Sequence, residues 1–160
     1  MASAANQVRL AGSPLGRYRH VCVFFNSKNE LYRLLVPFIQ EGLDQGECVF
    51  QIVDQRRHAE HVQRLEVAGI DVGEAQRTEQ MEIRHWEEAY LQDGHFDCQR
   101  QLSLIEGLLI DGKAKGFART RVMGGAEWAM SDRPGVREFI EYECRLNYRT
   151  ARIPFVAFMI

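Results

Sequence analysis

The sequence lacks the glycine-rich loop with which many α/β proteins bind phosphate groups. In "VCVFFNSKNEL" (residues 21–31), an apolar stretch runs directly into a helix start, and no glycine separates the two. A phosphate loop needs glycines for close backbone approach, a lysine, and a hydroxyl group that reaches magnesium. Only Ser27 and Lys28 are present, so the sequence disfavours ATP hydrolysis of the Walker type. A plain helix start, or one that attracts an anion, is the alternative.

Paired cysteines, long apolar runs and a large net charge are also missing. Cys22, Cys48, Cys98 and Cys144 form no Cys-x-x-Cys pair, and we interpret them as buried free thiols of a cytoplasmic protein. No apolar run approaches the ~18 residues that a membrane span requires. The net charge of −2 predicts no general attraction to nucleic acid or to an anionic membrane. The start, residues 1–16, lacks the apolar core of a secretory signal, and we expect a flexible leader there.

The remaining residues, 17–160, have the length and pattern of one α/β domain. Apolar, β-branched stretches predict strands at 20–25, 48–53, 81–86, 117–123 and 153–160. Helical periodicity predicts helices between them, at about 27–46, 54–69, 97–116 and 136–148. This alternation predicts a three-layer α/β sandwich, with a central, mostly parallel sheet and helices on both faces. Such sheets bind ligands beyond the carboxyl ends of their strands.

His20 and Cys22 lie two residues apart on the first predicted strand, which we expect to be buried on both faces. Their side chains therefore point to the same face. Three roles stay open: a core histidine with its polar atoms satisfied, the wall of a ligand site, and a metal or catalytic pair. No second pair at ligand spacing completes a metal site, so the third role is disfavoured.

The last predicted helix carries two polar residues within its apolar face. Val136, Phe139 and Ile140 form that face, and Glu143 and Asn147 fall inside it, one turn apart. A carboxylate and an amide on a buried face are costly without partners. Two hypotheses remain: a structural clamp to a loop backbone or to the strand arginines Arg119 and Arg121, and the polar wall of a small-molecule pocket.

The segment after the fourth predicted strand begins with two glycines, Gly124 and Gly125, which permit close approach of another group. Glu127 and Trp128 follow. Two roles stay open for Trp128: the lid of a pocket, and a packing residue of the core.

Several stretches, taken in order, resemble the MEDS domain, the methanogen/methylotroph DcmR sensory domain. They are "HVCVFF", "LVPFIQEGL", "YLQDGHFD", "RVMGG" with Trp128, and "YECRLN", and they cover about residues 18–158. The resemblance implies a core related to RecA and KaiC that has lost its phosphate loop. It implies a sensory domain that binds a small organic compound, such as a hydrocarbon derivative, and signals through a histidine-kinase-like or DNA-binding partner. A homodimer is left open.

The family pattern falls on His20, Cys22, Tyr90, Asp93, Gly94, Phe96, Asp97, Gly124, Trp128, Tyr142, Glu143, Arg145 and Asn147. The chain departs from it at Gly125, where relatives usually have an acidic residue, at Cys98, and at His85 and Trp86. We predict these ligand-binding residues, with no catalytic residue, metal or cofactor: His20, Cys22, Tyr90, Asp93, Gly124, Glu127, Trp128, Glu143 and Asn147. Trp128 would stack on the ligand, while Glu143 and Asn147 would orient it.

Two other functions stay open. One is a divergent RecA-like nucleotide-binding enzyme that uses Lys28 and Glu127. The other is a metal or redox sensor built on His20 and Cys22.

We expect no measurable ATP hydrolysis and no thermal stabilisation by Mg-ATP, because the junction at residues 21–31 lacks glycine. A ligand present at a hundred times its dissociation constant stabilises a protein by about 2.7 kcal/mol, which a thermal-shift assay detects. A saturable upward shift of the melting temperature with Mg-ATP would favour the nucleotide-binding enzyme instead.

Overall fold

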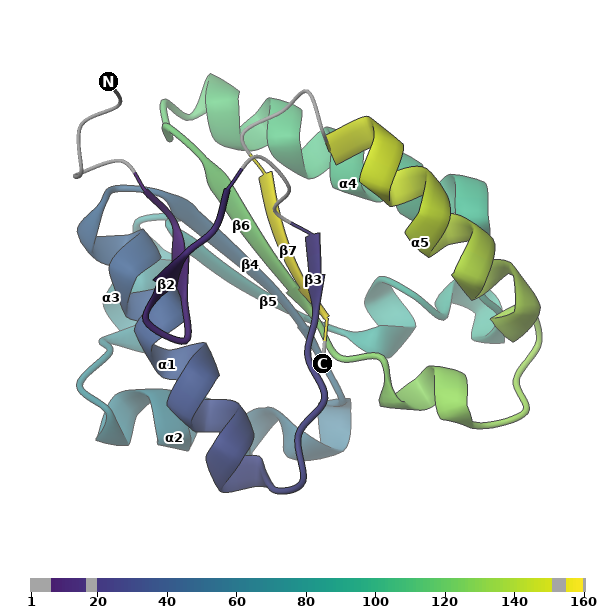
Figure 1. Ribbon diagram of the computed structural model, residues 1–160, viewed down its shortest axis with the longest axis horizontal. Coiled ribbons are helices and arrows are strands. Elements are labelled where there is room, and N and C mark those ends of the chain that lie inside the picture. Colours follow the sequence, from purple (N-terminus) through teal and green to yellow (C-terminus); the bar gives the residue numbers. More distant parts are fainter. Residues whose placement is uncertain (1–6, 17–19, 151–154, 160) are drawn as a thin grey trace.

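The computed structural model describes residues 7–16, 20–150 and 155–159. Its centre is a five-stranded sheet in the order β3-β7-β6-β4-β5 (Figure 1). The strands are β3 (His20–Cys22), β4 (Cys48–Val53), β5 (Met81–His85), β6 (Thr120–Gly124) and β7 (Phe155–Met159). Every neighbouring pair is parallel, so all five carboxyl ends meet at one edge of the sheet.

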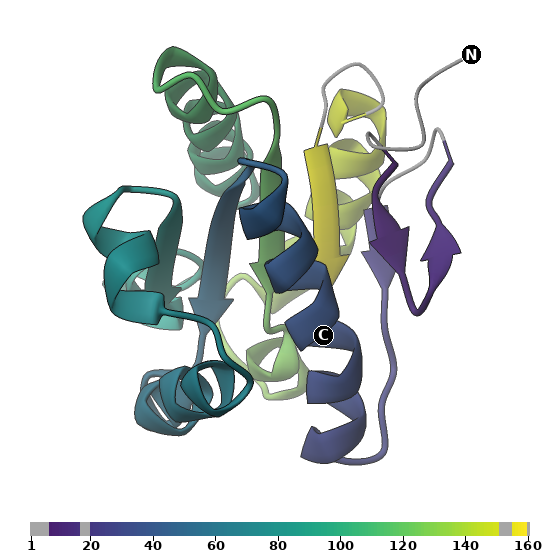
Figure 2. The same cartoon turned by 90° about the vertical axis from the view of Figure 1, so that its left-hand side faces the viewer.

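Helices cover both faces of the sheet, which confirms the predicted three-layer architecture. One layer contains α1 (Lys28–Asp44), α2 (His58–Val67) and α3 (Val72–Arg77), which stand in front of the sheet in Figure 2. The other contains α4 (Cys98–Ala114) and α5 (Val136–Thr150). Short 3₁₀ turns follow the strands at the carboxyl edge: η2 (Gln55–Arg57), η3 (Trp86–Glu88), η4 (Gln92–Gly94) and η5 (Glu127–Met130). A relationship to RecA and KaiC stays a prediction.

The strand β4 divides the core in two, because successive side chains of a strand point to opposite faces. Val49 packs with the α1–α3 layer, while Phe50 and Ile52 pack with α4 and α5. Both cores are therefore built on the same central strands. No helix among the described residues is long and apolar enough to cross a bilayer.

Side-chain caps begin the helices α1 and α4. The side chain of Ser27 accepts from the backbone N–H of Glu30 at 3.2 Å, and that of Asp97 accepts from the N–H of Arg100 at 2.6 Å. Each satisfies one of the unpaired amides of a first helical turn.

Two elements were not predicted from the sequence. One is the helix α3, which has only 6 residues. The other is an antiparallel hairpin within the predicted leader, formed by β1 (Arg9–Leu10) and β2 (Ser13–Pro14). The backbone N–H of Arg9 donates to Glu41 of α1 at 3.1 Å, and Val8 is buried against the α1–α3 layer. Elements this short carry too few residues for a periodic pattern.

The first strand is shorter than predicted, and its second half is not buried. The strand β3 ends at Cys22, and Phe24 is 90% exposed. Among the described residues, β3 lies at the edge of the sheet and pairs only with β7, where Cys22 faces Met159. An edge strand pairs with one neighbouring strand instead of two, so fewer contacts cover its apolar side chains. The last predicted strand is β7, and its residues 153, 154 and 160 lie outside the described part.

A buried ion network ties α1, β4 and β6 together. Arg121 of β6 is wholly buried and pairs with Glu47, and also with Glu41 at 2.8 Å. Its guanidinium also donates to the carbonyl of Phe38 at 2.8 Å, and Arg119 forms a second ion pair with Glu47. These arginines are thus occupied within the core, and Glu143 has a different partner.

We expect Arg121→Met to lower the free energy of unfolding by about 3–5 kcal/mol, because it leaves Glu47 buried with one partner removed. The control is Arg77→Met, which breaks an exposed ion pair with Glu74 and should cost no more than about 1 kcal/mol. Denaturant melts of both variants measure the difference. Equal losses would show that the buried network does not stabilise the fold.

Candidate functional site

The switch point of the sheet topology lies between β4 and β6. The chain leaves β4 towards α2 on one face of the sheet, and leaves β6 towards α5 on the other face. The two connections therefore separate and leave a crevice beyond the carboxyl ends of these strands, which is where open α/β sheets bind ligands. The N–H of Gly125 donates to the carbonyl of Ile52 at 2.9 Å and holds the two strand ends together there.

A cavity of about 60 Å³ occupies this crevice, between the start of α1, the end of β4, the start of α2 and the segment after β6. Leu31, Leu35 and Ile52 supply its apolar lining. Sites for drug-sized ligands measure about 300–1,000 Å³, so this cavity suits a much smaller molecule. Of the predicted site residues, Glu127 lines it.

The charged residues around the crevice neutralise one another. Lys28 pairs with Glu60 at 2.5 Å, and Arg57 with Glu127 at 3.1 Å. Asp54 is paired in the same way with Arg56, whose hydrogen bond holds the pKa of that carboxyl below its usual value. Only one oxygen of Glu127, Oε1, takes part in its pair, so Oε2 keeps its capacity to accept a hydrogen bond.

A buried polar relay runs behind the crevice from α1 to β4. Burial, with a smaller contribution from His58, lowers the pKa of His61 to about 4, so its ring is neutral at pH 7. Its Nε2 donates to Gln51 Oε1 at 2.6 Å, and its Nδ1 accepts from the hydroxyl of Tyr32 at 2.7 Å. This relay was not predicted from the sequence. The signal was Gln51, a polar residue in the middle of an otherwise apolar strand.

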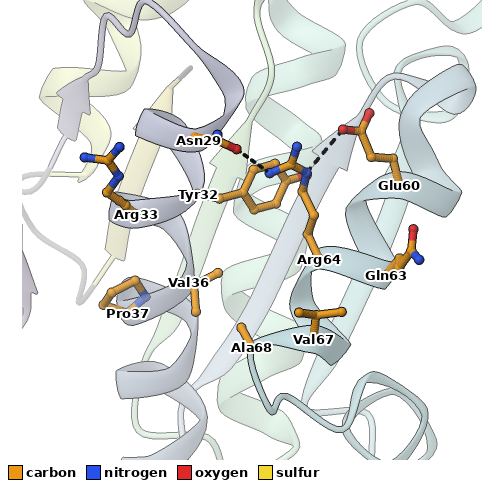
Figure 3. A pocket seen from close by; sticks show the side chains of 10 residues that line it. All are labelled: Asn29, Tyr32, Arg33, Val36, Pro37, Glu60, Gln63, Arg64, Val67 and Ala68. Carbon is orange, nitrogen blue, oxygen red and sulfur yellow. Dashed lines mark hydrogen bonds and ion pairs between the residues drawn. The ribbon is translucent and has the colours of Figure 1, made fainter.

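An open groove between α1 and α2 adjoins the crevice and has a volume of about 830 Å³ (Figure 3). Tyr32 and Glu60 line both spaces. Arg64 bridges the groove: its guanidinium lies 4.8 Å from the centre of the Tyr32 ring and bonds to Glu60 and Asn29 at 3.1 Å each (Figure 3). A substitution at Tyr32 or Glu60 therefore alters the lining of both the crevice and the groove.

A second cluster joins β3 to α5 and contains four predicted site residues. Nε2 of His20 lies 3.0 Å from Glu143 Oε2, and Nδ1 lies 2.9 Å from Asn147 Oδ1. The amide nitrogen of Asn147 donates to the backbone carbonyl of Glu143, which orients Oδ1 towards the ring. Both ring nitrogens therefore face acceptors, and both donate when His20 is an imidazolium. Cys22 lies beside this clamp, where burial and the charge of Glu143 raise the pKa of its thiol.

The buried face of the last helix, α5, differs from the predicted one. Ile140 is 72% exposed, while Tyr142 and Leu146 are buried against α4 and the sheet. Glu143 therefore stands at the edge of the buried face and not at its middle. The predicted structural clamp exists, but its partner is His20 and not Arg119 or Arg121.

Trp128 and Tyr90 lie in a packed aromatic cluster on the α4–α5 side of the sheet. Trp128 is 1% exposed, its ring stacks on Phe96 with centroids 5.2 Å apart, and Tyr90 and Phe139 adjoin it. Gly124 is required beside this cluster, because a Cβ there would lie 1.9 Å from the hydroxyl of Tyr90. Contact of Trp128 or Tyr90 with a ligand stays a prediction.

Carboxylates of both regions affect the pKa of Tyr90. Burial raises the pKa of its hydroxyl far above the usual range, and the carboxylates of Glu143 and Glu127 raise that pKa further. The hydroxyl of Tyr90 therefore stays protonated at neutral pH. Its pKa is affected by Glu143 of the clamp and by Glu127 of the crevice.

The other predicted site features lie apart from both regions. Asp93 is exposed in η4, where it adopts a left-handed conformation with φ of 57°. Within the described ranges, no group of three or more His, Cys, Asp or Glu side chains is arranged to hold a metal ion. All four cysteines are free, but Cys22 and Cys144 are exposed, which corrects the expectation of buried thiols.

We expect the clamp to stabilise the fold most at acidic pH. Burial alone would lower the pKa of His20, but Glu143 and Asn147 raise it above the ordinary value. Because the folded pKa is the higher one, this stability is fully present below about pH 6.5 and is lost as the pH rises through the folded pKa.

The test compares His20→Gln with the wild type in denaturant melts between pH 5.5 and 9. The variant should lose about 1 kcal/mol at the acidic end and much less at the alkaline end. His95→Gln, at an exposed turn position, is the control and should show no such trend. A loss that is constant or grows with pH would contradict an imidazolium clamp.

Comparison with known proteins places this fold in a family. The sequence profile of the MEthanogen/methylotroph, DcmR Sensory (MEDS) domain matches residues 19–159. The chain is also similar to a protein named transcriptional repressor DcmR from Methylorubrum extorquens (strain DSM 6343 / CIP 106787 / DM4), with 24% identity over 143 residues. That match covers 89% of this chain and 51% of the repressor, so the chain spans about half the length of that relative. The profile covers every strand of the central sheet, and this chain belongs to the MEDS family of sensory domains.

Proposed function

We propose that this protein is a non-enzymatic, cytoplasmic sensory domain whose small organic ligand binds in the crevice between β4 and β6. The observation that carries the proposal is the cavity of about 60 Å³ at the topological switch point of the sheet. Its apolar lining and mutually paired charges suit a small, uncharged molecule. Family membership supports the sensory role.

The size of the cavity argues against the nucleotide-binding enzyme. Sites for drug-sized ligands and cofactors measure about 300–1,000 Å³, several times more than this crevice. Lys28, which would have to bind phosphate, is already paired with Glu60. His61 also lines the cavity, and with a pKa of about 4 its ring is neutral at pH 7, so it provides no positive charge to bind a phosphate group.

The clamp between β3 and α5 gives the domain a way to report the ligand. A ligand beside Glu127 alters the field at Tyr90, which also interacts with Glu143 of the clamp. We propose that output passes through a DNA-binding or histidine-kinase-like partner, without direct contact between this domain and nucleic acid. The similarity to a longer protein named as a transcriptional repressor, 51% of which the match covers, supports such an arrangement. In this view His20, Cys22, Glu143 and Asn147 respond to the ligand and do not line its cavity.

The test is a titration of ¹⁵N-labelled protein with ethanol, acetone, dichloromethane, acetate and ethylamine, followed by NMR. A ligand of three or four heavy atoms gains at most about 1.5 kcal/mol per atom, so dissociation constants from tens of micromolar to millimolar are expected. At least one uncharged probe should saturably shift the amides of Leu31, Val53 and Gly125. Leu31→Phe should abolish these shifts by filling the cavity, while Leu34→Phe, on α1 but outside the crevice, should not.

Three outcomes would count against the crevice. Saturable shifts confined to His20 and Glu143 would place the ligand at the clamp, as the family resemblance first suggested. Equal binding to Leu31→Phe and wild type would move the site elsewhere. No saturable shift with any probe would remove the sensory proposal for this cavity.

A further inference from the structure

Two side chains form a shared wall between the crevice and the open groove. Tyr32 of α1 and Glu60 of α2 each line both spaces, which measure about 60 Å³ and about 830 Å³. Glu60 contributes a carboxylate that is bonded to Lys28 and Arg64, whereas Tyr32 contributes an aromatic ring, the larger of the two side chains. The space open to a ligand of the crevice therefore depends on the position of this ring.

The ring of Tyr32 is held by two partners from α2. Its hydroxyl donates to His61 Nδ1 at 2.7 Å, and burial raises the pKa of that hydroxyl to about 12, so it stays a donor at neutral pH. The guanidinium of Arg64 lies 4.8 Å from the ring centre, a distance at which a cation attracts an aromatic face (Figure 3). Arg64 is fixed in turn by hydrogen bonds to Glu60 and Asn29.

The groove on the other side of this wall offers apolar surface. Val36 and Pro37 of α1 line it, together with Val67 and Ala68 of α2, and Val67 is 82% exposed. Each methylene group buried against such surface tightens binding about fourfold. An alkyl chain that ran from the crevice into the groove would therefore bind more tightly than a short one, and the wall prevents this.

We propose that the ring of Tyr32 sets the upper size limit for the ligand of the crevice. It restricts the site to short uncharged compounds and excludes homologues whose chain would have to enter the groove. This inference rests on the proposed function and names the residue that determines ligand size for the same crevice.

A longer ligand can pass the wall only by moving the ring, and the ring's contacts oppose that movement. Displacement of Tyr32 leaves Nδ1 of His61, a buried residue, without its donor and separates the ring from Arg64. A buried acceptor without a partner is costly, because it has lost its bond to water as well. The wall is therefore part of the fixed shape of the site.

The experiment compares three pairs of probes that differ in chain length: ethanol with 1-hexanol, acetone with 2-heptanone, and dichloromethane with 1,6-dichlorohexane. Each probe is titrated into ¹⁵N-labelled protein and followed by NMR. In the wild type, at least one short probe should saturably shift the amides of Leu31 and Gly125, which line the crevice. Its longer homologue should shift these amides with an affinity at least tenfold lower, or not at all.

Matched variants separate the ring from its hydroxyl and from the rest of the groove. Tyr32→Ala removes the ring and should reverse the order, so that the longer homologue binds at least tenfold more tightly than the short probe and shifts Leu31 and Val67 together. Tyr32→Phe keeps the ring and should keep the preference for the short probe. Val36→Ala is the control, because Val36 lines the groove but not the crevice, and it should also keep that preference.

The result that overturns the inference is a longer homologue that binds in the wild-type crevice as tightly as its short partner; the proposed function then stands. Continued exclusion of the longer homologue by Tyr32→Ala overturns it as well, because the size limit then has another cause. Failure of every probe to bind in the wild-type crevice overturns the proposed function together with this inference. If Tyr32→Ala does not fold, Tyr32→Leu, which keeps an apolar side chain but removes the ring, decides the outcome in the same way.

Discussion

The fold depends on a charged side chain that has no access to water, Arg121. Its guanidinium is held by two carboxylates, Glu47 and Glu41, and by a backbone carbonyl of α1. Separating the members of a buried ion pair leaves a charge without compensation. The network therefore favours the one arrangement of α1, β4 and β6 in which all of these charges are paired. That arrangement sets the start of α1 beside the ends of β4 and β6. The contacts of Arg121 therefore help to position the crevice, although they lie at the opposite, amino-terminal end of the same strands.

The crevice beyond the carboxyl ends of β4 and β6, where open α/β sheets bind ligands, is small and its charged side chains are paired with one another. Lys28 and Arg57, the two cations that line the crevice, are both paired with glutamates of this chain. Burial keeps His61 neutral, so it contributes hydrogen bonds and not charge. The result is a small cavity in which apolar side chains lie beside charged side chains that are paired within the chain.

Two regions of the domain are suited to different tasks. The crevice has room for a small molecule, whereas in the clamp both ring nitrogens of His20 are paired with Glu143 and Asn147. Oε1 of Glu143 is buried without a hydrogen-bond partner among the described residues. Between them lies Tyr90, buried against Gly124 and within range of carboxylates from both.

Local patterns in the sequence determined the α/β class, the caps at Ser27 and Asp97, and most of the helices and strands, because these depend on neighbours a few residues apart. The resemblance placed His20, Glu143 and Asn147 among the residues of the family pattern, but it did not indicate that they contact one another. Tertiary structure decided their partnership, since His20 and Glu143 are brought together only when β3 and α5 pack. It decided that Phe24 and Ile140 face solvent although both lie in apolar patterns. Phe24 follows an edge strand that has one neighbour, and the orientation of α5 turns Ile140 away from the core. It also assembled the crevice from α1, β4, α2 and the segment after β6, a juxtaposition that no local pattern encodes.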